Sequence, residues 1–148
     1  EGGWPFELDP FTLATKGPCD LGGQLRAGDG FSAHPCIDIR RNHMVNVVVN
    51  MAQNAQKPFW KDCFRLLELD SNTECVSSQV VKLHRPLSFM HDFQITDKYA
   101  VCIQSPIAIS LLRVAFGASV VNASSEADDS AFIYVIRRRS SRTLQPCN

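Results

Sequence analysis

The chain has 148 residues, of which 45% are apolar and 20% are charged, a balance that suits one folded domain with a single sizeable core. Fifteen basic and fifteen acidic residues cancel, so no overall field recruits nucleic acid, and any contact with a membrane has to be apolar and local. The first residues carry neither the basic segment nor the apolar segment of a signal peptide.

Short segments of alternating or apolar composition, separated by turn residues, predict an all-β chain. His43–Met51 alternates clearly, with Val45, Val47, Val49 and Met51 on one face and a mostly polar outer face. Further strands are predicted at Thr12–Thr15, Cys36–Ile39, Met90–Ile95, Tyr99–Gln104 and Phe132–Arg137. Regularly spaced short strands indicate a sandwich, a barrel or a propeller, and periodicity does not choose among them.

Phe59–Leu69 is compatible with a strand and with a helical stripe of apolar residues. The polar segment Asp70–Thr73 supplies turn chemistry, and Val76–Leu83 supplies a returning partner. We therefore expect a hairpin of two strands here.

Six cysteines are spread along the chain without the close CxxC spacing of a zinc site or a redox motif: Cys19, Cys36, Cys63, Cys75, Cys102 and Cys147. A chain of this size does not need covalent cross-links to be stable. Free, mostly buried thiols are therefore favoured over disulfides.

Tyr99–Val121 is apolar and long enough to suggest a membrane span, but Gln104, Pro106 and Arg113 interrupt it. An arginine in mid-bilayer costs about 2.5–3.5 kcal/mol on insertion scales. A strand followed by a short apolar surface element at Ile107–Ala118, and a loop from Asn122, is the preferred interpretation. Arg137–Arg139 with Arg142 is interpreted as a solvated basic turn, or as a cluster that meets anionic headgroups.

Two histidines stand in distinctive surroundings, His34 between Ala33 and Pro35, and His91 between Met90 and Asp92. They lie too far apart in sequence to share a helix or a hairpin, so only tertiary folding can bring them together. On spacing alone, isolated histidines are more often surface or core residues than metal ligands.

Three blocks, Glu1–Leu13, Ala33–Asp38 and Ser88–Pro106, resemble the carotenoid cleavage oxygenase family in their order and spacing. That family includes carotenoid cleavage dioxygenases and proteins like retinal pigment epithelial membrane protein, and the resemblance extends to about Arg139. It implies a β-propeller with a metal on its central axis. Since a blade needs about 40–50 residues, residues 1–148 are expected to be a fragment of a single propeller oxygenase domain, about three blades of a larger propeller.

The resemblance implies that His34 and His91 are the first two of four histidine ligands of Fe(II). Glu1 matches a glutamate that hydrogen-bonds the second histidine and fixes its tautomer. His43 and His84 match no ligand position, and no side chain here matches a nucleophile or general base. Two histidines and two glutamates of the family pattern are missing, so the fragment alone is expected to be inactive.

The function implied is a non-haem Fe(II) dioxygenase that uses O2 to cleave a conjugated carbon–carbon double bond in a carotenoid or apocarotenoid. The alternatives are a stilbene-cleaving dioxygenase or retinoid isomerase of the same family, or a metal-free propeller that serves as a binding module. Ile107, Ile109, Leu111 and Leu112 match an apolar entrance for lipophilic polyene substrate at a membrane, with an ordinary packing segment as the alternative. The compartment stays open between cytoplasm and plastid, with peripheral membrane contact.

Overall fold

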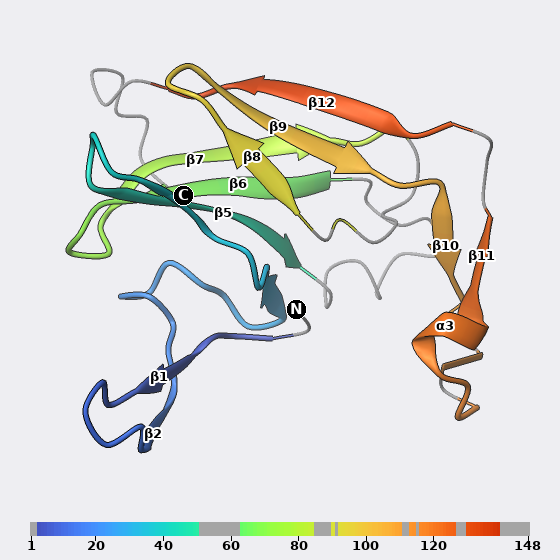
Figure 1. Ribbon diagram of the computed structural model, residues 1–148, viewed down its shortest axis with the longest axis horizontal. Helices are drawn as coiled ribbons and strands as arrows, with labels where there is room; N and C mark the ends of the chain where they lie inside the picture. The colour runs from blue at the N-terminus through green and yellow to red at the C-terminus, as the bar shows by residue number, and fades with distance from the viewer. Residues whose placement is uncertain are drawn as a thin grey trace.

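A computed structural model describes residues 3–50, 63–84, 90, 92–110, 113–114, 116–126 and 130–139 of the chain. The described part consists mainly of antiparallel strands (Figure 1), which confirms the all-β prediction. The strands are β1 (Phe6–Leu8), β2 (Thr15–Pro18), β3 (Asp29–Phe31), β4 (Cys36–Asp38), β5 (His43–Asn50), β6 (Cys63–Leu69), β7 (Cys75–Lys82), β8 (Phe93–Ile95), β9 (Tyr99–Gln104), β10 (Ile107–Ile109), β11 (Ser124–Glu126) and β12 (Phe132–Arg137). A short helix, α3 (Val120–Ala123), leads into β11.

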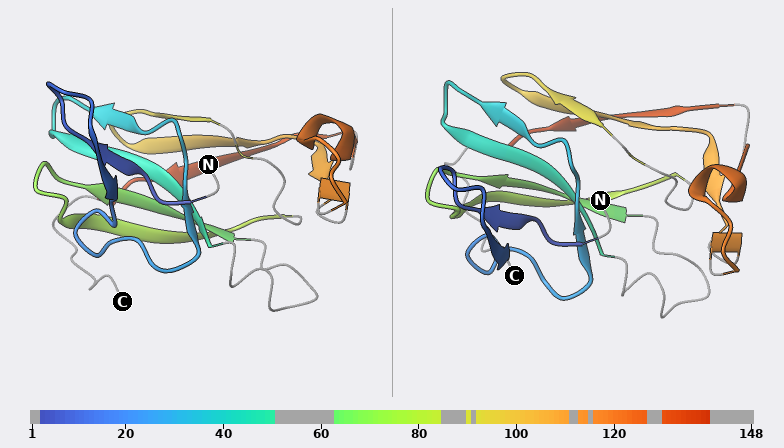
Figure 2. Two further views of the ribbon diagram at one scale, coloured as in Figure 1. Left: turned by 90° about the horizontal axis from the view of Figure 1, so that it is seen from below. Right: turned by 60° about the horizontal axis from the view of Figure 1, so that its bottom comes forward.

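Two sheets pack face to face and enclose the main core (Figures 1 and 2). The larger sheet has the order β3-β5-β6-β7, and β4 pairs with the first half of β5 on the edge that β3 shares. The smaller sheet has the order β12-β9-β8. The side chains buried between them come from both sheets and from the end of β7: Val45, Val47, Phe64, Leu66, Leu83, Phe93, Ala100 and Cys102. Since alternate residues of a strand face the same side, this core uses every second position of β5 and β6.

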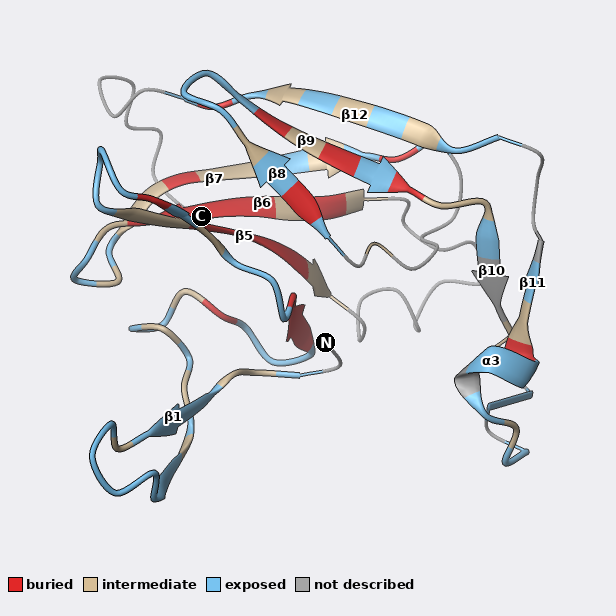
Figure 3. Cartoon of the chain, in the orientation of Figure 1, coloured by how far each residue is buried: buried red, intermediate tan, exposed pale blue. Residues whose placement is uncertain are grey.

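The second face of β5 carries Asn46, Val48 and Asn50 as predicted, but it is buried over Asn46 and Val48, so the expectation that it is an outer face is wrong. Asn46 and Val48 on that face are each only 1% exposed. Val48 packs in a second apolar cluster with Leu25 and Phe31, and Figure 3 shows much of β5 and β6 coloured as buried. The buried Asn46 amide is satisfied, because it donates to Ser32 O at 2.8 Å and accepts from Val47 N at 2.8 Å.

The strands with clear alternation match their predicted bounds, whereas those near the chain start do not. β9 and β12 lie at the predicted residues, and β4 to β8 lie within a few residues of prediction. Thr12–Thr15 is wrong as a strand, because Asp9 Oδ1 accepts from Phe11 N and Thr12 N and forms a turn there. Leu13 takes a positive φ of 59°, and the strand β2 begins only at Thr15.

The short strands β1, β3, β10 and β11 were not predicted from the sequence. β3 carries the buried Asp29, which accepts from Arg65 Nη2 and from Asn50 Nδ2, both at 2.7 Å. The segment expected to be a loop from Asn122 instead forms the end of α3 and the strand β11, which pairs with β10.

The cysteine prediction holds in part. Cys19, Cys36, Cys63 and Cys102 are free thiols, but only Cys102 among them is fully buried. Cys75 is disulfide-bonded, so the expectation of free thiols is wrong at this position.

Candidate functional site

The turn that carries His34 is fixed from its amino-terminal side. It joins β3 to β4, and the His34 side chain is exposed. Ser32 anchors the turn to β5, since Ser32 N donates to Val47 O at 3.1 Å and Ser32 O accepts from Asn46 Nδ2. Ser32 Oγ also accepts from His34 N at 3.3 Å, a local side-chain turn that sets the path of the backbone at the histidine.

The segment that leads into β8 contacts the start of β4. His91 lies outside the described residues, whereas its neighbours Met90 and Asp92 are described. Met90 packs against the main core, and Asp92 Oδ1 accepts from Phe93 N at 2.7 Å. Cys36 Sγ donates to Phe93 O at 3.3 Å and joins the two strands.

This thiol contact relates the two histidine positions. Cys36 stands two residues after His34, and Phe93 stands two residues after His91. The contact therefore brings together the two blocks singled out in the sequence, although they are separated by more than fifty residues of chain.

Both thiols at this junction are held in the protonated form. Burial raises the pKa of Cys36, and the Asp92 carboxylate raises it further, against a smaller opposing effect of Arg138. Burial raises the pKa of Cys102, which pairs with Phe93 in the sheet, to about 12. A raised pKa lowers the thiolate fraction of each cysteine, which makes both thiols poorer nucleophiles.

Of the remaining residues singled out in the sequence, some are described by the structure and others are not. Glu1, Leu111 and Leu112 lie outside the described residues, as His91 does. His43 begins β5, and His84 follows β7 with its ring 5.2 Å from that of Phe132. Within the part of the chain that the structure describes, no group of three or more histidine, cysteine and acidic side chains is placed to hold a metal ion.

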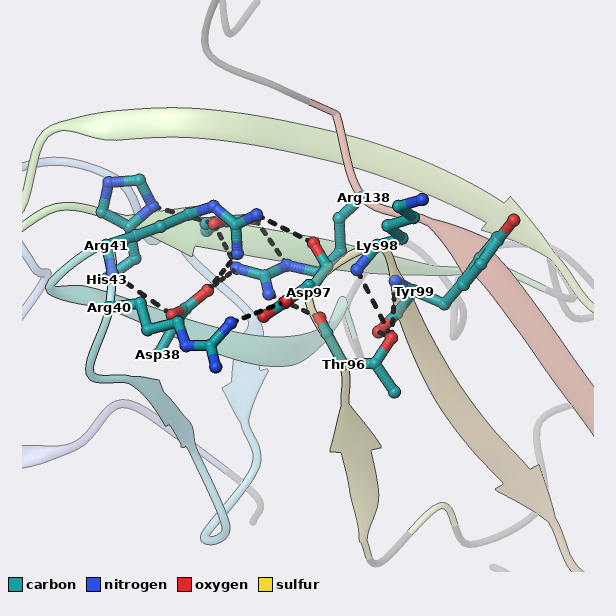
Figure 4. A network of polar contacts seen from close by, with 10 residues as sticks. Asp38, Arg40, Arg41, His43, Thr96, Asp97, Lys98, Tyr99 and Arg138 are labelled. Atoms are coloured by element: carbon teal, nitrogen blue, oxygen red, sulfur yellow. Dashed lines mark hydrogen bonds and ion pairs between the residues drawn. The ribbon is translucent and has the colours of Figure 1, made fainter.

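The opposite ends of β4 and β8 carry a buried ion-pair network, centred on Arg138 (Figure 4). Arg138 Nη2 lies 2.7 Å from Asp38 Oδ2 and 2.6 Å from Glu68 Oε1, and Nη1 donates to Thr96 O at 2.8 Å. All three charged side chains are at least nine-tenths buried. Because Arg138 follows β12 while Asp38 and Glu68 belong to the larger sheet, the network joins the two sheets.

Four more side chains extend this network: His43, Arg41, Arg40 and Asp97. His43 Nδ1 lies 2.9 Å from Glu68 Oε1, and Arg41 Nη1 donates to Asp38 Oδ2 at 2.6 Å. Arg40 Nη1 donates to Asp97 Oδ2 at 2.9 Å (Figure 4).

The pKa values of the network reflect this pairing. Burial alone would raise the pKa of Asp38, but hydrogen bonds from Arg41 and Arg138 outweigh it and hold that pKa well below its usual range. Burial likewise opposes the charge of Arg138, yet its hydrogen bonds to Glu68 and Asp38 raise its pKa.

Sequence reasoning missed this network and assigned Arg138 to a solvated turn, which is wrong. A signal was present, because Glu68 stands between Leu67 and Leu69 and Asp38 follows Ile37 at the end of a predicted strand. An acid in an apolar strand needs a buried cation as its partner.

A further surface feature lies at β10 and α3, at the right of Figure 1 and remote from the Arg138 network. Exposed apolar side chains gather along this part of the chain: Ile107 (41% exposed), Val114 (36%), Phe116 (88%) and Val121 (82%). Within the described residues, no helix has the length and apolar character needed to cross a membrane.

Comparison with known proteins gives consistent matches. The model of the family described as retinal pigment epithelial membrane protein matches residues 1–147. The apocarotenoid-15,15'-oxygenase of Synechocystis sp. is 34% identical over 117 residues, which are 79% of this chain and 24% of that enzyme. The chain thus spans about a quarter of the length of this relative.

Solved structures agree with the sequence match. Cobalt-substituted Synechocystis ACO aligns over 95% of this chain and 29% of its own, with 30% identity and a TM-score of 0.77. A chimera of ACO and RPE65 aligns over 93% of this chain and 29% of its own, with 30% identity and a TM-score of 0.74.

Proposed function

The chain belongs to the retinal pigment epithelial membrane protein family of carotenoid oxygenases and forms part of its β-propeller. We propose that it is part of a non-haem Fe(II) dioxygenase. The reaction proposed is cleavage of a conjugated carbon–carbon double bond of a carotenoid or apocarotenoid by O2. The name of the Synechocystis relative, an apocarotenoid-15,15'-oxygenase, supports this substrate class.

His34 and His91 are proposed as two of the iron ligands. The observation that carries the proposal is the hydrogen bond from Cys36 Sγ to Phe93 O, since each partner stands two residues after one of the histidines. His34 also fits a ligand on its own account, because its turn is anchored through Ser32 to the buried strand β5. A ligand on an anchored turn loses little conformational freedom when it binds a metal.

Glu1 is proposed to orient the imidazole of His91 through a hydrogen bond. The course of the chain after Glu1 supports this role, because Gly3 O accepts from Phe31 N at 3.0 Å. The chain start therefore runs beside β3, the strand that leads into the His34 turn.

The iron would supply the site at which O2 is bound and activated next to the polyene. The residues of this chain would hold the ion through neutral imidazole.

The exposed apolar residues at β10 and α3 are proposed to form part of an entrance for lipophilic substrate at a membrane surface. Ile107, Val114 and Phe116 belong to this surface and lie within the predicted element Ile107–Ala118, and Val121 extends the surface beyond that element. Ile109, Leu111 and Leu112 are proposed to line the same entrance.

The test of the ligand assignment compares three variants of the complete protein. His34→Ala and His91→Ala should each lose most of the bound iron and the cleavage activity, whereas His84→Ala should retain both. Iron content is measured per folded protein by elemental analysis, and cleavage is measured by loss of polyene absorbance. Equal iron loss in all three variants would mean that histidine removal damages the fold, and the ligand assignment would fail.

A further inference from the structure

A cavity of about 370 Å³ opens beside the Arg138 network, and the proposed oxygenase function does not use it. Its walls come from the start of β5, from β6, from the β8–β9 turn and from the end of β12. The volume lies within the range of small-ligand pockets. Its lining is dominated by charged side chains, which include Arg41, Lys98 and the three arginines Arg137–Arg139.

The acidic groups at this cavity are already neutralised. Asp38 and Glu68 are paired with Arg138, and Asp38 also with Arg41. Asp97, which lines the cavity, is paired with Arg40 at 2.9 Å. The three acids Asp38, Glu68 and Asp97 therefore match the three arginines Arg138, Arg41 and Arg40, so these groups together carry no formal excess charge.

Three cationic side chains that line the cavity, Lys98, Arg137 and Arg139, take no part in these ion pairs. Among the described residues, no carboxylate forms an ion pair with Lys98, Arg137 or Arg139, and all three residues are exposed. The backbone brings them together, since Arg138 N donates to Lys98 O at 2.8 Å and Arg137 pairs with Tyr99 across the sheet. A chain with no net charge thus gathers, around one cavity, three positive side chains that pair with no carboxylate in the described part of the chain.

We propose that this cavity binds an anion that carries phosphate, held by Lys98, Arg137 and Arg139 at its rim. Several cations around one cavity attract a multiply charged anion more strongly than a single carboxylate. Guanidinium groups match phosphate oxygens in pairs, and the lysine adds a mobile point charge.

The inner ion pairs give the site its rigidity. Arg138, which stands between the two rim arginines, is held by Asp38, Glu68 and Thr96 O and is only 4% exposed. The backbone on either side of it is therefore fixed, so that Arg137 and Arg139 are presented from a firm base. The phosphate can belong to a free anion or to a lipid headgroup, and the chemistry of recognition is the same.

The first arm of the test is calorimetric titration of the complete protein with inorganic pyrophosphate at low ionic strength. Lys98→Gln, Arg137→Gln and Arg139→Gln should each weaken binding by about two- to fivefold, the range for exposed ion pairs. The triple variant should bind about ten- to a hundredfold more weakly. Arg26→Gln, which removes an exposed arginine away from the cavity, should bind as the unchanged protein does.

The second arm separates the two sources of phosphate. Vesicles of phosphatidylcholine with a phosphatidylinositol phosphate are compared with vesicles of phosphatidylcholine alone in a sedimentation assay. Retention that depends on the phosphoinositide and falls in the triple variant assigns the cavity to headgroups, and pyrophosphate binding without such retention assigns it to a free anion. No pyrophosphate binding by the unchanged protein, or equal binding by the triple variant, would overturn the proposal.

Discussion

The two strands β4 and β8 run in the same sense, and their two ends are held in different ways. At their starts, next to His34 and to the segment of His91, a hydrogen bond from the Cys36 thiol to Phe93 O joins them. At their far ends, Arg138 connects Asp38 and Glu68 with the β8–β9 turn through contacts of 2.6–2.8 Å (Figure 4). A thiol is a weak donor, whereas charge-assisted hydrogen bonds are about twice as strong as neutral ones.

This difference indicates that the two ends of β4 and β8 have different roles. The far end is already satisfied by side chains of this chain and fixes how the two sheets are oriented. At the near end, the His34 side chain is exposed and its turn is anchored through Ser32 to Asn46.

The largest expected effect is at the far end. Arg138→Ala leaves the carboxylates of Asp38 and Glu68 buried without their main partner, which should lower the free energy of unfolding by about 3–5 kcal/mol. Urea unfolding followed by tryptophan fluorescence measures this loss.

Arg40→Ala is the matched control, because it removes an arginine from the exposed pair with Asp97. Such a pair is worth about 1 kcal/mol or less. If the two variants unfold at the same urea concentration, the buried network does not hold the sheets together.

The second largest effect expected is a loss of stability at acid pH, through Asp38 at the far end. The pKa of Asp38 lies below its usual value of about 4, so the unfolded chain binds more protons than the folded chain in acid. The stabilisation is present above about pH 4 and is lost as the pH falls below it. Asp38→Asn should flatten this part of the stability profile and lower the free energy of unfolding at pH 7 by about 1.5–3 kcal/mol.

Asp9→Asn provides the comparison, because the pKa of Asp9 is lowered by hydrogen bonds from Thr12 and Phe11 in an exposed turn. Its effect on the acid limb should be smaller than that of Asp38→Asn. If Asp38→Asn leaves the loss of stability below about pH 4 unchanged, another carboxylate is responsible for that loss.

Much of the fold was predictable because the apolar alternation in β5, β9 and β12 is local information. Val45 and Val47 alternate with residues of the other face, and Tyr99–Gln104 and Phe132–Arg137 form strands with the predicted bounds. The second face of β5 was not predictable in this way, because its burial depends on segments distant in sequence: Asn46 donates to Ser32 O, and Val48 packs with Leu25.

The candidate site likewise contains residues that local sequence identifies and residues that it does not. His34 could be singled out from its neighbours Ala33 and Pro35 and from the family resemblance. Arg138 could not be separated from Arg137 and Arg139 by composition, since its burial depends on Glu68, which is 70 residues away in the chain. Partners of that separation are chosen by the topology of the sheets.

A smaller effect is expected where the near ends of the two strands meet. Cys36→Ala removes the donor to Phe93 O and should lower the free energy of unfolding by about 0.5–1.5 kcal/mol, whereas Cys36→Ser retains a donor and should restore part of the loss. Cys63→Ala is the control, since Cys63 is an equally half-buried free thiol at the start of β6. An equal loss in Cys36→Ala and Cys63→Ala would assign the effect to lost packing and not to the hydrogen bond.

The smallest effect on folding is expected at His34 itself. Its side chain is exposed, and the turn around it is held by Ser32 and Asn46, so His34→Ala should change the unfolding free energy of the metal-free protein by about 0.5 kcal/mol or less. The iron-loaded protein should respond differently, because a ligand that binds only the folded state stabilises it, and does so more as the free ligand concentration exceeds the Kd. Adding Fe(II) anaerobically should therefore raise the melting temperature of the unchanged protein and have little effect on His34→Ala. A variant that is already unstable without metal would place His34 among the residues that hold the fold, and the contrast between the two ends of β4 would then be lost.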